Sequence, residues 1–182
     1  MVSRSSPWVQ RAWPSRLRPR ESAHRTQKTA VIFGLANKRS IAWAIAQKLH
    51  QAGWRLAITY QNERLGLEAR DLIAEMPGAA GFMCDVTKDD EIARLFDELK
   101  SRYGVLHGLV HSVGFAPPEE LKNPFLNTTR EGFRIAHDIS VYSLIAVARG
   151  AAPLMTTGGG MVTRSEERRV GKECRSRWSP YH

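Results

Sequence analysis

The residues best suited to chemistry form a short glycine loop near the start of the chain. Gly34 follows the apolar run Thr29–Phe33, and Ser40 and Ile41 come after a gap of five residues. A strand that leads through a glycine into a helix N-terminus can bind a phosphate, because free N–H groups and the positive end of the helix dipole face the anion. The spacing is not that of the common G-x-G-x-x-G fingerprint. An ordinary strand–helix turn capped by Ser40 therefore remains an alternative.

The elements that must position this loop lie between residues 28 and 163, where apolar runs alternate with helical patterns. This alternation predicts an α/β fold: a Rossmann-like, doubly wound parallel sheet, truncated after about the fifth strand. The expected strands are Thr29–Phe33, Arg55–Tyr60, Ala80–Cys84, Leu106–Ser112 and Gly160–Thr163. Helices are expected at about 40–53, 63–76 and 129–149, and a further helix follows Thr87 and carries residues 92–99; a loop is expected around residues 114–118.

Finer patterns predict how two of the helices begin and which sides they bury. Thr87 and Asp90 form a capping-box-like pair ahead of an apolar stripe made by Ile92, Leu95, Phe96 and Leu99. In the first helix, the apolar pattern puts on one side Ile41, Ala44, Ile45, Lys48 and Leu49.

Ligands of open parallel sheets bind at the carboxyl ends of the strands. Gly34, Gln61, Asp85 and the turn Ser112–Gly114 come directly after the first four expected strands. We therefore expect these residues to meet at one edge of the sheet and to form the binding site.

The formal charge of +9 is concentrated at the two ends of the chain. Residues 1–27 hold six arginines against one glutamate, and residues 164–182 hold six basic residues against three acidic ones. The segment 28–163 is close to neutral, with 15 basic and 14 acidic residues. A nucleic-acid function is therefore not expected, and a salt-sensitive binder that uses the basic, tryptophan-containing ends is kept as an alternative.

The 182 residues suit about one domain, which we place at 28–163 as an incomplete dinucleotide-binding domain. Residues 1–27 contain three prolines, which favour a basic disordered or non-native extension over an amphipathic transit peptide. Residues 164–182 follow neither a helical nor a strand period, so we expect a foreign, disordered tail.

Other candidate sites are weak. Cys84 ends an apolar run and is expected to pack as a small hydrophobe, and the two cysteines suggest neither a disulfide nor a zinc site. His107 and His111 would lie about 13 Å apart on a strand, too far to share a metal. His137 and its acidic neighbour are expected to be structural. No apolar run reaches the length of a membrane span, and a cytoplasmic location is expected.

Beyond the glycine loop, the chain contains in order Thr59–Asn62, Cys84–Val86, His111–Pro117, Arg130–Phe133 and Ala136–Ser140. With these motifs, residues 28–163 closely resemble the NADH-dependent enoyl-acyl-carrier-protein reductase of bacterial fatty-acid synthesis, a divergent short-chain dehydrogenase/reductase. The resemblance implies an enoyl-acyl-carrier-protein substrate, NADH as cofactor, no metal and a homotetramer.

The resemblance also implies roles at matching positions. Gly34, Ser40 and Ile41 would line the pyrophosphate, and Gln61 would lie by the adenosine ribose, where its neutral side chain favours NADH and nearby Arg64 leaves NADPH open. The remaining roles fall at the ends of the third and fourth strands. Asp85 and Val86 would hold the adenine, Ser112, Val113 and Gly114 would pass the nicotinamide ribose, and Ala116 would approach the acyl substrate. From the residues alone, Asp85 equally fits a helix cap.

The implied reaction transfers a hydride from NADH to a trans-2-enoyl thioester, and a tyrosine with a following lysine supports it in the family. No tyrosine of this chain has a lysine four or seven positions later, and Tyr142, followed by Arg149, is expected to be a packing or surface residue. We therefore expect a truncated, inactive copy without catalytic residues. A non-catalytic NAD-binding module, another short-chain dehydrogenase/reductase and a chain that does not fold stably remain alternatives.

Overall fold

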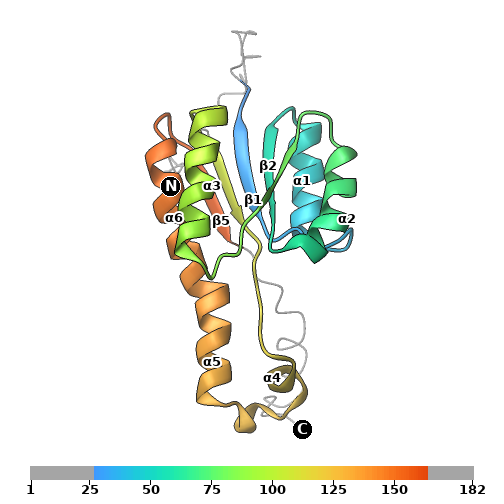
Figure 1. Cartoon of the computed structure of the whole chain (residues 1–182), viewed down its shortest axis with the longest axis vertical. Helices are drawn as coiled ribbons and strands as arrows, with labels where there is room; N and C mark the ends of the chain where they lie inside the picture. The colour runs from blue at the N-terminus through green and yellow to red at the C-terminus, as the bar shows by residue number, and fades with distance from the viewer. Residues whose placement is uncertain (1–26, 164–182) are drawn as a thin grey trace, which may run out of the picture.

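The structure, a computed structural model, describes residues 27–163. Five parallel strands form one sheet in the order β3-β2-β1-β4-β5 (Figure 1). Their bounds are Thr29–Phe33, Arg55–Tyr60, Ala80–Met83, Gly108–His111 and Gly160–Thr163 for β1 to β5. The predicted Rossmann-like sheet is confirmed. Apart from residue 27, the extension predicted at residues 1–27 and the tail predicted at residues 164–182 lie outside the described residues.

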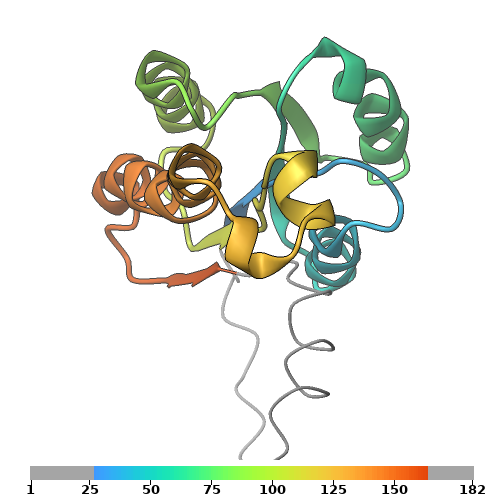
Figure 2. The ribbon, with the colours of Figure 1, turned by 90° about the horizontal axis from the view of Figure 1, so that it is seen from below.

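Helices cover both faces of the sheet (Figure 2). On one face lie α1 (Ile41–Gln51) and α2 (Glu63–Ala74), and on the other lie α3 (Asp89–Tyr103) and α6 (Ser143–Ala151). The short helix α4 (Pro118–Lys122) and α5 (Arg130–His137) extend beyond the ends of the strands (Figure 1). The remaining turns are η1 (Phe125–Asn127), the π-helix η2 (Asp138–Tyr142) and η3 (Ala152–Leu154).

The sheet separates two apolar cores. Val31 and Phe33 of β1 pack toward α3 and α6, whereas Ala30 and Ile32 pack toward α1 and α2. This alternation follows from the period of two in a strand, and a strand buried on both faces is apolar throughout. The predicted α3 stripe of Ile92, Leu95, Phe96 and Leu99 is buried as expected.

The register brings the strand ends to one edge. Phe33 of β1 pairs with His111 of β4, so the residues that follow, Gly34 and Ser112, leave the sheet side by side. The chain crosses from one side of β1 to the other between β3 and β4, which makes the end of β1 the point where the strand order reverses. Open α/β sheets bind ligands at such a point.

Three local predictions require correction. Helix α1 buries Ala42, Trp43 and Ala46, a side rotated from the predicted one: Ile45 and Leu49 still pack against this core, whereas Ala44 is exposed. The loop around residues 114–118 runs into α4 at Pro118. The single long helix predicted at 129–149 consists of α5, η2 and α6.

Candidate nucleotide-binding site

A cavity of about 260 Å³ opens at the carboxyl ends of the strands. Its walls come from the segments after β1, β2, β3 and β4 and from the π-helix η2. The lining residues are Gly34, Leu35, Ala36, Thr59, Gln61, Leu65, Cys84, Val86, Ser112, Val113, Gly114, Phe115 and Ile139.

Six residues predicted from the sequence line this cavity: Gly34, Gln61, Val86, Ser112, Val113 and Gly114. The other four do not. Ser40 and Ile41 lie at the start of α1, Asp85 directly precedes the lining residue Val86, and half-buried Ala116 follows the lining residue Phe115.

Gly34 is held where a side chain has no room. Its φ of 94° lies in the left-handed region that favours glycine. A Cβ at Gly34 would overlap the carbonyl oxygen of Ser112 and lie 2.7 Å from the carbonyl carbon. The next residue, Leu35, donates its N–H to the Thr59 carbonyl at 3.2 Å. The loop therefore packs directly between the ends of β2 and β4.

Asn37 organises the rest of the loop. Its side-chain oxygen accepts the Arg39 N–H at 2.8 Å, and its carbonyl accepts the Ser40 hydroxyl at 2.7 Å and the Ser40 N–H at 3.1 Å. An asparagine that bonds the backbone two residues on forms an Asx-turn. This role was missed from the sequence, although the position of an asparagine between a glycine and a helix cap could have suggested it.

Ser40 caps helix α1, because its hydroxyl accepts the Trp43 N–H at 3.2 Å. The first turn of α1 holds no acidic side chain, so the positive end of the helix dipole is not neutralised there. Ser40 is therefore a helix cap, as the alternative interpretation expected. This cap does not prevent the loop from binding a phosphate.

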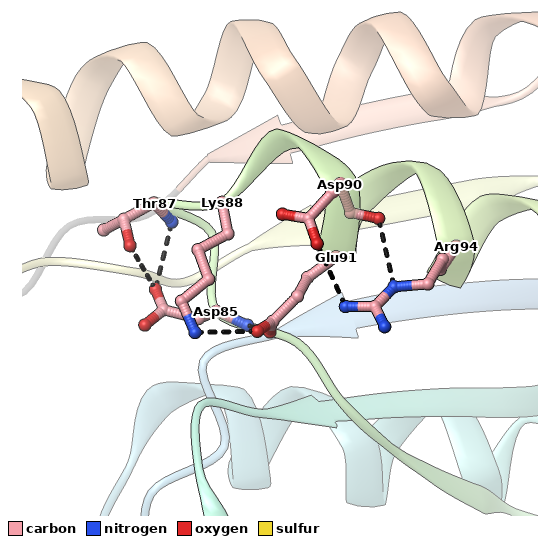
Figure 3. Close-up of polar contacts among 6 residues, drawn as sticks. All are labelled: Asp85, Thr87, Lys88, Asp90, Glu91 and Arg94. Atoms are coloured by element: carbon pink, nitrogen blue, oxygen red, sulfur yellow. Dashed lines mark hydrogen bonds and ion pairs between the residues drawn. The ribbon is translucent and has the colours of Figure 1, made fainter.

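Asp85 takes part in a turn before α3, and the predicted Thr87–Asp90 capping box is wrong (Figure 3). One Asp85 carboxylate oxygen accepts both the Thr87 N–H at 3.0 Å and the Thr87 hydroxyl at 2.8 Å. Thr87 therefore bonds backward and does not cap the helix. Asp90 instead pairs with Arg94 one turn further along α3, at 3.2 Å.

Glu91 holds this turn against the helix (Figure 3). Its carboxylate accepts the Asp85 N–H at 2.8 Å and pairs with Lys88 at 2.8 Å. Burial acts to raise the pKa of Asp85, but the hydrogen bonds from Thr87 and Gln61 and the charge of Lys88 outweigh it and lower the pKa. Asp85 therefore stays an ionised acceptor, and its contact with Gln61 connects the ends of β2 and β3.

The β4 side of the cavity depends on a distant segment. Ser140 of η2 accepts the Phe115 N–H at 3.0 Å and donates its hydroxyl to the Phe115 carbonyl at 3.2 Å. Ile139, the neighbour of Ser140, lines the cavity. Sequence reasoning missed Ile139 because nothing in the local pattern shows that a π-helix turns it toward β4.

The cysteine and histidines considered as other candidate sites make packing and backbone contacts. Cys84 is buried against the cavity, and burial raises its pKa to about 12, so the thiol is uncharged as its predicted packing role requires. The Nδ1 of His107 accepts the Thr29 N–H, and His137 stacks on Phe133. Within residues 27–163, no group of three or more His, Cys, Asp or Glu side chains is placed to hold a metal ion. None of the helices in that range has the length and hydropathy of a membrane span.

Comparisons with known proteins all point to the same family. A family model described as "Enoyl-(Acyl carrier protein) reductase" matches residues 34–172. The enoyl-[acyl-carrier-protein] reductase [NADH] FabI of Bacillus subtilis is 48% identical over 138 residues, which cover 75% of this chain and 54% of the relative. The Escherichia coli protein of the same name is 40% identical over 139 residues, covering 76% and 53%.

Solved structures agree in fold. The Bacillus cereus enoyl-acyl carrier protein reductase, crystallised with NADP+ and indole naphthyridinone, matches with a TM-score of 0.72 and 45% identity over 75% of this chain and 54% of its own. The Aquifex aeolicus enzyme matches with a TM-score of 0.72 and 44% identity, covering 75% and 59%. The chain spans about half the length of the curated relatives that it matches.

Proposed function

Since the chain belongs to the enoyl-(acyl carrier protein) reductase family, we propose that residues 28–163 are the NADH-binding portion of such a reductase. The observation that carries the proposal is the packing of Gly34 on Ser112. It brings the glycine loop and the β4 loop to one cavity at the point where the strand order reverses.

The cavity fits part of a dinucleotide. Its volume of about 260 Å³ lies just below the roughly 300–1,000 Å³ of sites that enclose a whole small molecule. Gln61 and Gly114 on its walls are exposed, so a longer ligand extends from it into solvent. The mixed lining suits a nucleotide, because apolar Val86 and Leu65 face a base while the polar Gln61 and Ser112 reach sugar hydroxyls.

Each predicted residue then has a physical task in binding. The loop from Gly34 to Ile41 would place its backbone and the positive end of α1 against the pyrophosphate, while its Leu35, Arg39 and Ser40 N–H groups hold the loop in shape. Asp85 accepts from the adenine amine as an ionised carboxylate, next to the apolar contact of Val86. The turn Ser112–Gly114 passes the ribose on the nicotinamide side, and Ala116 lies toward the acyl substrate.

We infer a preference for NADH over NADPH. Gln61, at the end of β2, is neutral and offers no charge to a 2′-phosphate, whereas a free 2′-hydroxyl can bond to its amide. Exposed Arg64 in the first turn of α2 is the residue that could oppose this preference.

In the whole protein, bound NADH would supply a hydride to a trans-2-enoyl thioester carried by acyl carrier protein. The residues of this chain would bind and orient the cofactor. Tyr60 is buried in β2, and neither Tyr103 nor Tyr142 lines the cavity described for residues 27–163. We therefore propose that the 182-residue chain binds NADH without reducing the thioester.

Two measurements on the full chain test this function. Titration of NADH fluorescence should give saturable binding that is tighter than for NADPH, and incubation with crotonyl thioester should leave NADH absorbance unchanged. Absence of binding at millimolar NADH would rule out the nucleotide site. Steady oxidation of NADH that depends on the thioester would show that this chain contains the catalytic groups.

A further inference from the structure

A buried histidine of β4 bonds to a buried serine at the start of α6. The Nε2 of His111 lies 2.8 Å from the Ser143 hydroxyl oxygen, and the Nδ1 lies 3.1 Å from the hydroxyl oxygen of Thr163 on β5. His111 and Ser143 are both 0% exposed. Buried polar groups are costly unless they are bonded, so this pair must be held in a specific geometry.

The direction of each bond follows from the available protons. The Ser143 hydroxyl donates its one proton to the Ile139 carbonyl at 2.6 Å. Its oxygen therefore accepts from His111, which must carry the proton on Nε2. Burial lowers the pKa of His111 and keeps the ring neutral, so its Nδ1 accepts from the Thr163 hydroxyl. The bonds run in one direction from β5 through β4 to η2.

The last acceptor belongs to the wall of the cavity. Ile139 lies in the π-helix η2, and π segments are frequent at functional sites because they change where side chains point. The next residue, Ser140, holds both the N–H and the carbonyl of Phe115. The bond from Ser143 therefore fixes a segment whose two neighbouring residues, Ile139 and Ser140, shape the β4 side of the cavity.

We propose that His111 and Ser143 are positioning residues that hold η2 against the Ser112–Phe115 loop and thereby set the nicotinamide side of the site. This inference rests on the proposed NADH function. Neither residue lines the cavity, so both act through Ile139 and Ser140. The adenine side, formed after β2 and β3, takes no part in these bonds.

The test compares NADH with ADP, which occupies the adenine side alone. Ser143→Ala should weaken NADH binding about five- to tenfold, the effect of one lost buried hydrogen bond, and should leave ADP binding unchanged. His111→Gln, which keeps an amide donor for Ser143, should weaken it less than His111→Leu. Equal weakening of NADH and ADP would mean a general loss of structure and would overturn the proposal, as would no change in either.

Amide exchange in the ligand-free chain provides an independent readout. The Phe115 amide should exchange faster in Ser143→Ala, as in Ser140→Ala, while the β2 amide of Ile58 keeps its protection. Unchanged exchange at Phe115 would overturn the proposal whatever the NADH result. If the wild-type chain bound neither ADP nor NADH, the proposed function would be wrong. The exchange test would still decide whether Ser143 holds the Phe115 segment.

Discussion

Gly34 and Ser112 touch through their backbones: a Cβ on Gly34 would overlap the carbonyl oxygen of Ser112. The two residues are 78 positions apart, and the pairing of Phe33 with His111 brings them together. This contact joins the glycine loop to the β4 loop, so the shape of the candidate site depends on it.

Gly34→Ala should therefore cost more than backbone strain alone. Gly53 offers a matched control, since its φ is 80° and a Cβ there would meet nothing within 4 Å. We expect Gly53→Ala to lower the free energy of unfolding by about 1–2 kcal/mol, the cost of a left-handed conformation. Gly34→Ala should lower it further and abolish NADH binding. Equal effects of the two variants in urea unfolding would show that the contact with Ser112 does not matter.

Asn37→Ala should loosen the loop without unfolding the domain. The substitution removes the side-chain bond to the Arg39 N–H, a loss of about 1 kcal/mol that we expect as a five- to tenfold weaker NADH affinity. Lys48→Ala is the control, because Lys48 lies on α1 outside this loop and its exposed side chain bonds Gln51 at 3.3 Å, a contact that contributes little. Calorimetry measures the NADH affinity of both variants. Equal affinities would disprove the role of Asn37 in ordering the loop.

Asp85 should titrate below its ordinary range. Its lowered pKa contributes stability that is present above the unfolded value near 3.9 and is lost as the pH falls through the folded value. Thr87→Val removes the hydroxyl bond and should move the pKa of Asp85 upward, as read by carboxyl NMR titration. Thr128→Val, in a loop away from Asp85, should not. An Asp85 pKa that is the same in both variants would contradict the observed turn.

His111 should make the free energy of unfolding depend on pH in a range above that of Asp85. Its folded pKa is lowered by burial, so the unfolded chain binds the proton more readily. Stability is therefore complete above the unfolded value near 6.5 and declines as the pH falls below it toward the folded value. His111→Gln should remove this slope below pH ~6.5 in denaturant unfolding. His50→Gln, on the exposed end of α1, should retain it.

The strands were predictable because buried parallel strands are apolar runs with clear ends. Thr29–Phe33 and Arg55–Tyr60 agree with the structure at both ends. The ends of β1 to β4 then indicated where a candidate site should lie, since parallel strands finish at one edge. The features that were missed depend on contacts between distant residues.

Ile139 illustrates that limit. A π-helix arises here within an uninterrupted helical pattern, and its position is tied to His111 and Ser143 through a buried hydrogen bond that sequence periodicity does not encode. The predicted orientation of α1 was wrong for a similar reason, because the sheet beneath the helix decides which of its sides, here the one with Trp43, faces the core. Thr87 does not cap the helix because its N–H and hydroxyl both donate to the Asp85 carboxylate in a competing Asx-turn.

The most direct test of the account is an amide NMR spectrum of the full chain titrated with NADH. We predict that shifts concentrate in residues 34–41, in Gln61, Asp85 and Val86, and in residues 112–115, while the amides of α4 remain unchanged. Shifts that avoid the Gly34–Ile41 loop, or none at millimolar NADH, would contradict the central claim that this loop binds the pyrophosphate.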